Sequence, residues 1–436
     1  MGKSSFHSGV HPEGHKEMSC EKAFRPFLPA GDLVFPLGQH IGKPAAPVVK
    51  RGDTVLAGQL IAEANGFISA NIVSSVSGKV KMVDANSITI TSDGEFTLAE
   101  GIGTQTDPTT LSNQEILARV KAAGIVGLGG AGFPTHVKLA PKNPEEIDYI
   151  IANGAECEPY ITCDDRLMQE SPAEIIGGMQ IILQMFPGAK GVVAIEDNKP
   201  KAVEAMKKAA EGTGIEVLAI ETRYPQGGER TLIYTVTGRM LAAGKLPADL
   251  GCIVDNVATI AAVYKAVAKN TPLMEKGFTV TGDAITEPAN FIVKIGTPVS
   301  ALVEACGGFR VQPKKLILGG PMMGMAKADI DIPVQKANNA LLAMAEDGVE
   351  LAYEQMTACI RCGMCTRSCP IGLYPQLMAQ AAMKKDYERY EKLYGLQCMQ
   401  CGSCTYACPA KRPLMELFKM TKAAVMMEKA KQKEGK

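Results

Sequence analysis

The residues with the most specific chemistry are eight cysteines that repeat one spacing. They form two runs near the C-terminus, Cys359, Cys362, Cys365 and Cys369, then Cys398, Cys401, Cys404 and Cys408. Each run ends in Cys-Pro, which completes the C-x2-C-x2-C-x3-C-P pattern of two-cluster ferredoxins. Three thiolates spaced by three residues can wrap one loop around three corners of a cubane. The sequence therefore predicts two [4Fe–4S] clusters and electron transfer.

In two-cluster proteins with this spacing, the fourth cysteine of each run ligates the other cluster. We expect the first cluster to be held by Cys359, Cys362, Cys365 and Cys408, and the second by Cys398, Cys401, Cys404 and Cys369. Zinc is the alternative for closely spaced cysteines. It takes four ligands from paired C-x-x-C knuckles, a pattern that two three-plus-one runs fit poorly.

The composition indicates a folded, multidomain protein from a reducing compartment. The chain has 436 residues, with 46 Lys and Arg against 46 Asp and Glu, so no net field recruits nucleic acid. Residues 1–20 are polar, contain His7, His11 and His15, and include no apolar signal segment, so we expect neither secretion nor a disulfide framework. No apolar stretch reaches the roughly 18–20 residues of a membrane helix. The remaining cysteines share no spacing and are expected as buried small side chains: Cys20, Cys157, Cys163, Cys252 and Cys306.

The periodicity of the chain divides it into four regions. Short Val- and Ile-rich runs separated by glycine over residues 30–95 resemble a biotinyl/lipoyl-type barrel-sandwich hybrid, although the expected hairpin tip, residues 64–71, lacks a modifiable lysine. Apolar strands at 147–153, 191–196 and 215–221, with a helix at 201–210, predict a largely parallel α/β sheet. Residues 278–320 predict a β-rich module with a helix at 299–306, and the chain is helical from about 350.

The C-terminal tail allows two interpretations. Residues 411–436 hold eight Lys and Arg against three Glu, with apolar residues at roughly helical spacing. One interpretation is a solvated terminal helix whose apolar face packs on its own domain. The other is docking onto a partner or an acidic membrane surface.

A glycine-rich segment, Gly127-Leu-Gly-Gly-Ala-Gly-Phe-Pro, could approach a phosphate closely through its backbone N–H groups. It satisfies G-x-G-x-x-G formally. A Rossmann fingerprint also needs a helix running on from the last glycine, and Pro134 and Pro141 interrupt that stretch. A Rossmann domain of the common kind is therefore disfavoured.

Several segments are similar to the FMN- and NADH-binding segments of the flavoprotein subunit of respiratory complex I. These segments are residues 127–138, 153–159 with Asp165-Arg166, 224–230 and 255–259. The order of the regions resembles the RnfC family, whose members are subunits of Rnf complexes, membrane-bound ferredoxin:NAD⁺ oxidoreductases coupled to ion pumping. This resemblance implies a barrel-sandwich hybrid over 1–110, an α/β FMN- and NADH-binding domain over 111–270, an SLBB-like β-grasp module over 271–345 and a helical dicluster domain over 346–436.

The same resemblance implies roles for individual residues. The FMN set would be Gly127, Gly129, Gly130 and Gly132 around the phosphate, Lys138 as its cationic partner, Asn153 and Glu156 at the isoalloxazine and ribityl groups, and Asn256 and Thr259 closing the phosphate site. The NADH set would be Phe133, Glu158 and Glu229. The chain departs from the complex I pattern at Leu128 and Ala155, where that family carries an Arg and an Asp.

The implied function is coherent, because a flavin can exchange two electrons with NADH and one with a cluster. Expected partners are the other subunits of the complex, including a ferredoxin-type subunit, and the expected location is peripheral, on the cytoplasmic face of the membrane. Two alternatives remain open. One is a soluble relative, such as a cobalamin reductase or the electron-transfer protein of an amino-acid reductase. The other is an iron–sulfur relay without nucleotide, which Leu128 and Ala155 favour.

Overall fold

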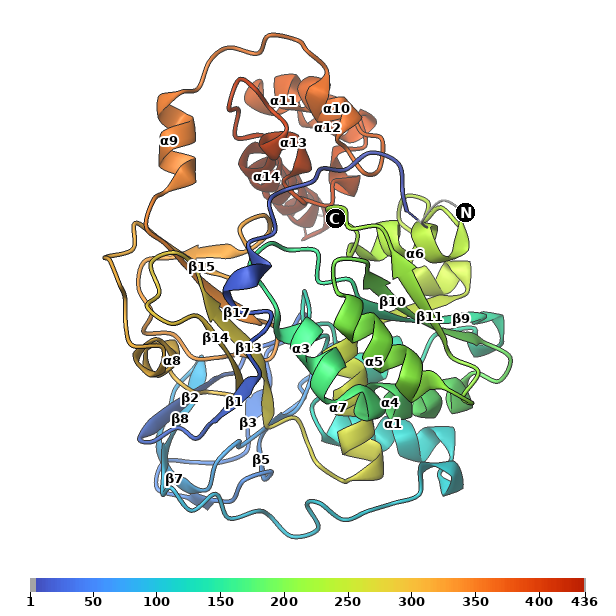
Figure 1. Cartoon of the computed structure of the whole chain (residues 1–436), viewed down its shortest axis with the longest axis vertical. Helices are drawn as coiled ribbons and strands as arrows, with labels where there is room; N and C mark the ends of the chain where they lie inside the picture. The colour runs from blue at the N-terminus through green and yellow to red at the C-terminus, as the bar shows by residue number, and fades with distance from the viewer. Residues whose placement is uncertain (1–4, 435–436) are drawn as a thin grey trace.

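The barrel region, residues 30–110, consists of two small antiparallel sheets. The computed structural model describes residues 5–434 and places this region at the lower left of Figure 1. One sheet has the order β2 (Asp32–Pro36), β8 (Ser87–Ser92), β7 (Gly78–Val83), β4 (Thr54–Val55); the other has the order β3 (Ala46–Pro47), β5 (Leu60–Glu63), β6 (Ile72–Val73). Alternate residues of each strand face inward, as Leu33 and Phe35 do in β2.

The parallel-sheet region, residues 111–270, has four strands in the order β11 (Glu216–Ile220), β10 (Lys190–Glu196), β9 (Tyr149–Gly154), β12 (Cys252–Asn256). All neighbouring strands are parallel. The helices of the region are α1 (Asn113–Ala122), α2 (Thr135–Lys138), α3 (Cys163–Glu170), α4 (Pro172–Met185), α5 (Pro200–Ala210), α6 (Glu229–Thr237) and α7 (Val257–Ala268).

Both faces of this sheet are buried, so its strands are apolar on consecutive residues. Ile150 and Ala152 of β9 pack in the core shared with α1, α4, α5 and α7. Ile151, on the opposite face, packs with Leu232 and Ile233 of α6. The chain runs outward from β9 to β10 and β11 and then returns to the other side of β9 as β12. In such sheets, ligands bind outside the carboxyl ends of the strands where the order reverses, here β9 and β12.

The mixed-sheet region, residues 271–345, contributes five of the six strands of the next sheet. Its order is β1 (Phe24–Phe27), β14 (Ala289–Lys294), β13 (Glu275–Thr281), β17 (Ala340–Met344), β15 (Lys315–Leu318), β16 (Met325–Lys327), with α8 (Val299–Ala305) packed on it. Strand β1 comes from the N-terminal segment, runs parallel to β14 and places Phe27 edge-on to Phe291. Four residues are too few to show a periodicity, so the sequence did not predict this pairing.

The cysteine region, residues 346–434, is helical and lies at the top of Figure 1. It contains α9 (Gly348–Glu354), α10 (Met364–Arg367), α11 (Pro375–Met383), α12 (Tyr387–Lys392), α13 (Ser403–Tyr406) and α14 (Leu414–Glu434). Phe418 and Val425 of α14 are buried in the core around Tyr390, so the terminal helix packs on its own domain. The apolar face inferred for this tail is therefore internal. None of the helices within residues 5–434 is long and apolar enough to cross a membrane.

Five short 3-10 helices complete the chain: η1 (Lys16–Met18), η2 (Pro108–Thr110), η3 (Pro144–Glu146), η4 (Pro247–Leu250) and η5 (Gly395–Gln397).

One fully buried lysine ties three regions together. Lys336, from the mixed-sheet region, donates from Nζ to the carbonyl oxygens of Asn71 in the barrel region, at 2.5 Å, and of Gly124 in the parallel-sheet region, at 2.7 Å. Burial lowers the pKa of Lys336 to about 7. The ammonium group is desolvated but hydrogen-bonded, so it replaces water at a contact that would otherwise bury two bare carbonyl groups.

Replacement of this lysine should change how stability depends on pH. The folded-state pKa lies below the unfolded value, so between the two values the unfolded chain binds more protons and the free energy of unfolding rises with pH. Urea unfolding should show the wild-type chain gaining about 1–2 kcal/mol on Lys336→Met between pH 7 and pH 9. The exposed Lys50→Met is the control. A wild-type advantage that is flat or falls with pH would contradict this account of Lys336.

Candidate functional site

The two cysteine runs share one backbone geometry. Arg361 and Gln400 have φ values of 58° and 56°, and Gly363 and Gly402 have φ values of 75° and 79°. Each run thus curls through two left-handed residues before entering α10 or α13. The curl turns backbone amides toward sulfur, as in the hydrogen bond from Gln400 N to Cys398 Sγ at 3.4 Å. Such amide–sulfur bonds are part of how proteins hold and tune iron–sulfur clusters.

The second run surrounds a pocket, and Cys369 of the first run lies in the same pocket. The lining includes Cys369, Cys398, Cys401 and Cys404 together with Met378, Met415 and Phe418. Burial raises the pKa of Cys398 to about 11, and the nearby thiols of Cys401 and Cys369 act in the same direction. The thiols have a high pKa here because no cation offsets their charge, whereas a bound metal deprotonates its thiol ligands. Four sulfur donors within an apolar wall fit an iron–sulfur cluster.

The first run is open to solvent. Cys359 and Cys362 are exposed, and Cys365 is half-buried. Burial raises the pKa of Cys365, and the nearby Cys408 thiol contributes to the rise. The structure therefore brings Cys408 toward the first run and Cys369 toward the second. This placement agrees with the crossed ligand sets, which remain a prediction.

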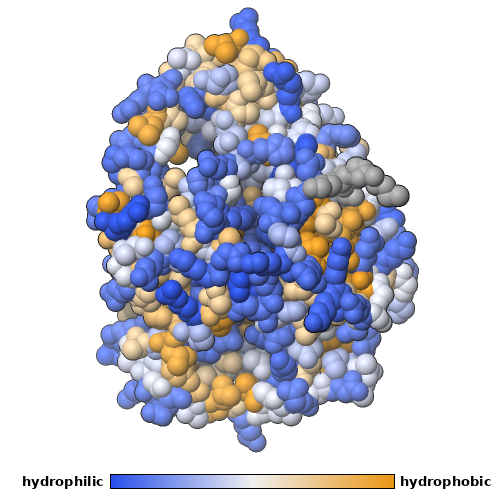
Figure 2. All heavy atoms as spheres, in the orientation of Figure 1, coloured by the Kyte–Doolittle hydropathy of each residue, from blue (hydrophilic) through white to orange (hydrophobic). Residues whose placement is uncertain are grey.

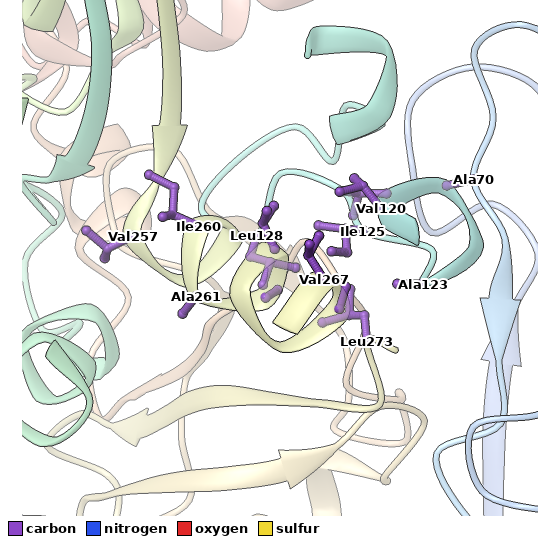
Figure 3. Packing of buried hydrophobic residues seen from close by; sticks show 14 of the residues in the cluster. Ala70, Val120, Ala123, Ile125, Leu128, Val257, Ile260, Ala261, Val267 and Leu273 are labelled. Carbon is purple, nitrogen blue, oxygen red and sulfur yellow. The ribbon is translucent and has the colours of Figure 1, made fainter. Parts of the chain in front are cut away.

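The glycine segment closes into a loop at the carboxyl edge of the parallel sheet. Gly127 N donates to Phe133 O at 2.9 Å, and Leu128 N donates to Thr259 Oγ1 in α7 at 3.0 Å. The Leu128 side chain is buried against α7, near Ile260 and Ala261 (Figure 3). Leu128 thus serves the core and leaves only its backbone to the loop.

Individual glycines in this loop do different work. A Cβ on Gly129 would lie 2.5 Å from the Asn256 amide nitrogen, whereas a Cβ on Gly130 would meet no atom within 4 Å. A Cβ on Gly132, where φ is +70°, would crowd the Gln39 carbonyl and His40 of the barrel region. The open side of the loop is therefore at Gly130. That is the side on which a phosphate could approach the backbone.

Asn153 and Asn256 stand at the ends of β9 and β12, where the topology places the crevice. Asn153 Nδ2 donates to Gly227 O at 2.9 Å. Asn256 caps α7, with Oδ1 accepting from Ala258 N at 2.8 Å, while its Nδ2 donates to Asp164 at 2.6 Å. These contacts orient both amides and connect the crevice to the start of α3.

Glu156 and Glu158 are engaged within the protein. The Glu156 carboxylate accepts from Asp164 N at 2.7 Å and from Asp165 N at 3.2 Å, which caps α3, and burial raises its pKa to about 8. Glu158 accepts from Met322 N at 3.0 Å and from the Tyr224 hydroxyl at 3.3 Å. The Glu158 carboxylate thus joins the parallel-sheet region to the mixed-sheet region.

Lys138 is already paired with carboxylates. Its Nζ donates to Val254 O at 2.7 Å and lies 3.3 Å from Asp255 and 3.6 Å from Glu229. Burial alone would lower the pKa of Lys138, but these two carboxylates outweigh it and raise the pKa. Asp255 Oδ2 is buried without a hydrogen-bond partner. Any phosphate would therefore share this cation with two acids. Phe133, the remaining residue of the expected nucleotide set, is half-buried in the loop.

Sequence reasoning missed a junction where three regions meet. Val10, Tyr224 and Cys401 form a buried cluster, flanked by Cys157, Met322 and Met399. Arg230 donates to Gln397 Oε1 at 2.8 Å, and a Cβ on Gly228 would lie 2.7 Å from Met399. The second cysteine run therefore abuts the edge of the parallel sheet. No spacing pattern could reveal a contact between residues so far apart in the chain.

The other cysteines divide into two groups. Cys163, Cys252 and Cys306 are buried, as expected. Cys20 and Cys157 are half-buried, and Cys157 Sγ accepts from Gly227 N at 3.3 Å beside the junction. Cys157 is thus more than a space-filling side chain.

Four family models match successive parts of the chain. They describe the RnfC barrel sandwich hybrid domain over residues 4–101, the Nuo51 FMN-binding domain over 120–265, the SLBB domain over 278–326 and the 4Fe-4S dicluster domain over 358–412. These matches confirm the predicted fold class and the FMN and iron–sulfur cofactors.

Similar proteins include two that match nearly the whole chain. The chain is 44% identical to a subunit of the proton-translocating ferredoxin:NAD(+) oxidoreductase complex from Clostridium ljungdahlii, over 90% of this chain and 87% of the relative. It is 39% identical to the subunit of the same designation in the Na(+)-translocating ferredoxin:NAD(+) oxidoreductase complex from Acetobacterium woodii, over 98% of each. An air-oxidized NAD+-reducing [NiFe]-hydrogenase shares the fold, with a TM-score of 0.51 and 17% identity over 94% of this chain and 87% of that one. The chain belongs to the RnfC family, the family of these subunits of ion-translocating ferredoxin:NAD⁺ oxidoreductase (Rnf) complexes.

Proposed function

We propose that this chain exchanges electrons with NAD(H) at an FMN and passes them through two [4Fe–4S] clusters to another subunit of a membrane-bound complex. The observation that carries the proposal is the junction. The second cysteine run packs against Tyr224, Gly228 and Arg230, which lie beside the carboxyl edge of the parallel sheet. A flavin in the crevice and a cluster in the second run would thus be neighbours.

The residues at the crevice suit an FMN. The open side of the loop at Gly130 admits a phosphate to backbone amides, and Thr259 and Asn256 fix the loop from α7. Asn153 offers an amide at the strand end between them. The flavin supplies the conversion between a hydride, which carries two electrons, and single electrons for the clusters. The protein binds and orients it, and no side chain has to act as acid or base.

The structure also supports an order for the clusters. The second run is buried at the junction, whereas the first run is exposed at Cys359 and Cys362. The second cluster would therefore be proximal to the flavin and the first would face the partner. Figure 2 shows apolar surface gathered at the top of the molecule, over the cysteine region. Exposed Ile360, Met364 and Tyr374 lie in or near the first run.

The complex and its location follow from the relatives. Their names describe complexes that move protons or Na(+) while exchanging electrons between ferredoxin and NAD(+). We propose that this chain acts in such a complex as a peripheral subunit on the cytoplasmic face, in electronic contact with a ferredoxin-type subunit.

The crossed ligand sets can be tested at Cys369. After anaerobic reconstitution, the wild-type chain should hold about eight iron and eight sulfide, and Cys369→Ala should damage the cluster of the second run. Electron paramagnetic resonance of reduced samples, with Cys398→Ala and Cys359→Ala as references, identifies which cluster changes. If Cys369→Ala reproduced the Cys359→Ala spectrum, the ligand sets would not be crossed.

The flavin site can be tested at Gly130, because a Cβ there meets open space in the protein alone. Gly130→Val should leave the thermal midpoint and both clusters unchanged and weaken FMN more than about a hundredfold, since several charge-assisted bonds to the phosphate are blocked. FMN titration by fluorescence quenching measures this effect. Gly348→Val, also in open space, is the matched control.

Two neighbouring positions are poor substitutes for this test. Gly129→Val would strike Asn256, and Lys138→Ala would leave Asp255 buried without its cation, so both changes should destabilise the fold. Unchanged FMN affinity in Gly130→Val would show that the loop is a turn with no ligand against it.

Electron entry can be tested with NADH under anaerobic conditions. NADH should bleach first the flavin and then the cluster absorbance of the wild-type chain. Glu229→Gln should raise the NADH concentration required roughly tenfold without loss of FMN, if this half-exposed carboxylate accepts from the nucleotide hydroxyls. The exposed Glu388→Gln is the control. A flavin-loaded chain that NADH does not bleach would instead be an iron–sulfur relay without nucleotide.

A further inference from the structure

We propose that residues 6–19, here called the N-terminal strap, position the second cluster against the flavin site. The strap crosses the molecule between the cysteine region and the two regions below it, and it appears as the dark blue segment in Figure 1. This inference rests on the proposed function, because it concerns the distance between the two redox sites. It assigns a task to a segment that precedes the barrel region and has no part in that region's two sheets.

The strap contacts the junction from both sides. Val10 pairs with Tyr224 through two backbone hydrogen bonds of 2.9 Å each, and its side chain is buried with Tyr224 and Cys401. Ser8 Oγ donates to Cys369 O at 2.9 Å. Cys369 lines the pocket of the second run, so the strap bonds directly to the backbone of an expected cluster ligand.

The strap is anchored on the parallel-sheet region at its beginning. Arg223 Nη1 donates to Ser8 O at 2.7 Å, and the Arg223 guanidinium lies 5.8 Å from the centre of the buried Phe6 ring. Gly9 has a φ of +81° and passes so close to Tyr224 that a Cβ would lie 2.6 Å from the Tyr224 carbonyl oxygen. Only glycine fits this crossing without strain.

The end of the strap fixes the loop that leads out of β9. Lys16 Nζ donates to the carbonyl oxygens of Glu156, Glu158 and Ile161 at 2.9, 3.0 and 2.6 Å. His15 stacks on Tyr160 with ring centres 4.6 Å apart. This loop carries Cys157 and Glu158 to the junction, so the strap holds both partners of the contact.

A positioning role predicts a specific kinetic effect. In Gly9→Val, NADH should reduce the flavin at the wild-type rate, whereas reduction of the clusters by the flavin should slow roughly ten- to a hundredfold, because small displacements of reacting groups are costly. Stopped-flow absorbance separates the two phases. Hydrogen–deuterium exchange supplies a readout that needs no turnover: amides 398–404 and Tyr224 should exchange faster in the variant.

Two further variants keep the test decisive. Gly31→Val has the same left-handed φ, +80°, but its Cβ meets nothing within 4 Å, so cluster reduction and exchange at 398–404 should both stay at wild-type values. Ser8→Ala removes only the bond to Cys369 and should slow the cluster phase by about two- to tenfold, even if Gly9→Val does not fold. Wild-type exchange and wild-type cluster reduction in Ser8→Ala and Gly9→Val would overturn the proposal. Equal slowing of flavin and cluster phases would show damage to the flavin site instead. Failure of NADH to reduce the wild-type flavin would contradict the proposed function alone, because the exchange measurement would still test the strap.

Discussion

The contact between Tyr224 and Cys401 is the constraint on which the arrangement of the redox sites depends. An electron can pass between a flavin and a cluster only if the two are held close together, and here they belong to separately folded regions. The junction achieves this with a small apolar cluster rather than a large interface. A small contact fixes distance only when the segments that carry it are themselves immobilised. Much of the remaining structure can be understood as meeting that requirement.

Buried lysines do much of this immobilising. Lys16, Lys276 and Lys336 each donate to backbone carbonyl oxygens of segments distant in sequence, and Lys199 donates to Ala155 O beside the crevice. Burial lowers the pKa of Lys276 to about 8 and that of Lys336 to about 7, so each site carries a desolvation cost. What these sites gain is directionality, since an ammonium satisfies two or three carbonyl groups at once. Such contacts specify how regions dock more sharply than apolar area alone.

The crevice itself relies on backbone and amide groups. Leu128 and Ala155, where the complex I flavoprotein carries charged residues, both lie in apolar cores. Asn153, Asn256 and Thr259 hold the surrounding loops, and the one cation, Lys138, is shared by Asp255 and Glu229. A site built in this way recognises shape and phosphate position more than net charge. It suits a cofactor that stays bound while NAD(H) comes and goes.

The sequence by itself determined the features that are local in the chain. The doubled cysteine spacing specified cluster chemistry, since three ligands of each cluster lie within seven residues, and the alternation of apolar runs specified the parallel sheet and its helices. The glycine loop was recognisable because backbone approach to a ligand leaves its mark on consecutive residues. Only the tertiary structure decided which partners meet. It placed β1 in the mixed sheet, turned Glu156 and Glu158 to contacts within the protein, paired Lys138 with two acids and brought Val10 and Cys157 to Cys401. These contacts join residues that are distant in sequence through single side chains or backbone pairs, and a contact of that kind produces no period or spacing from which it could be predicted.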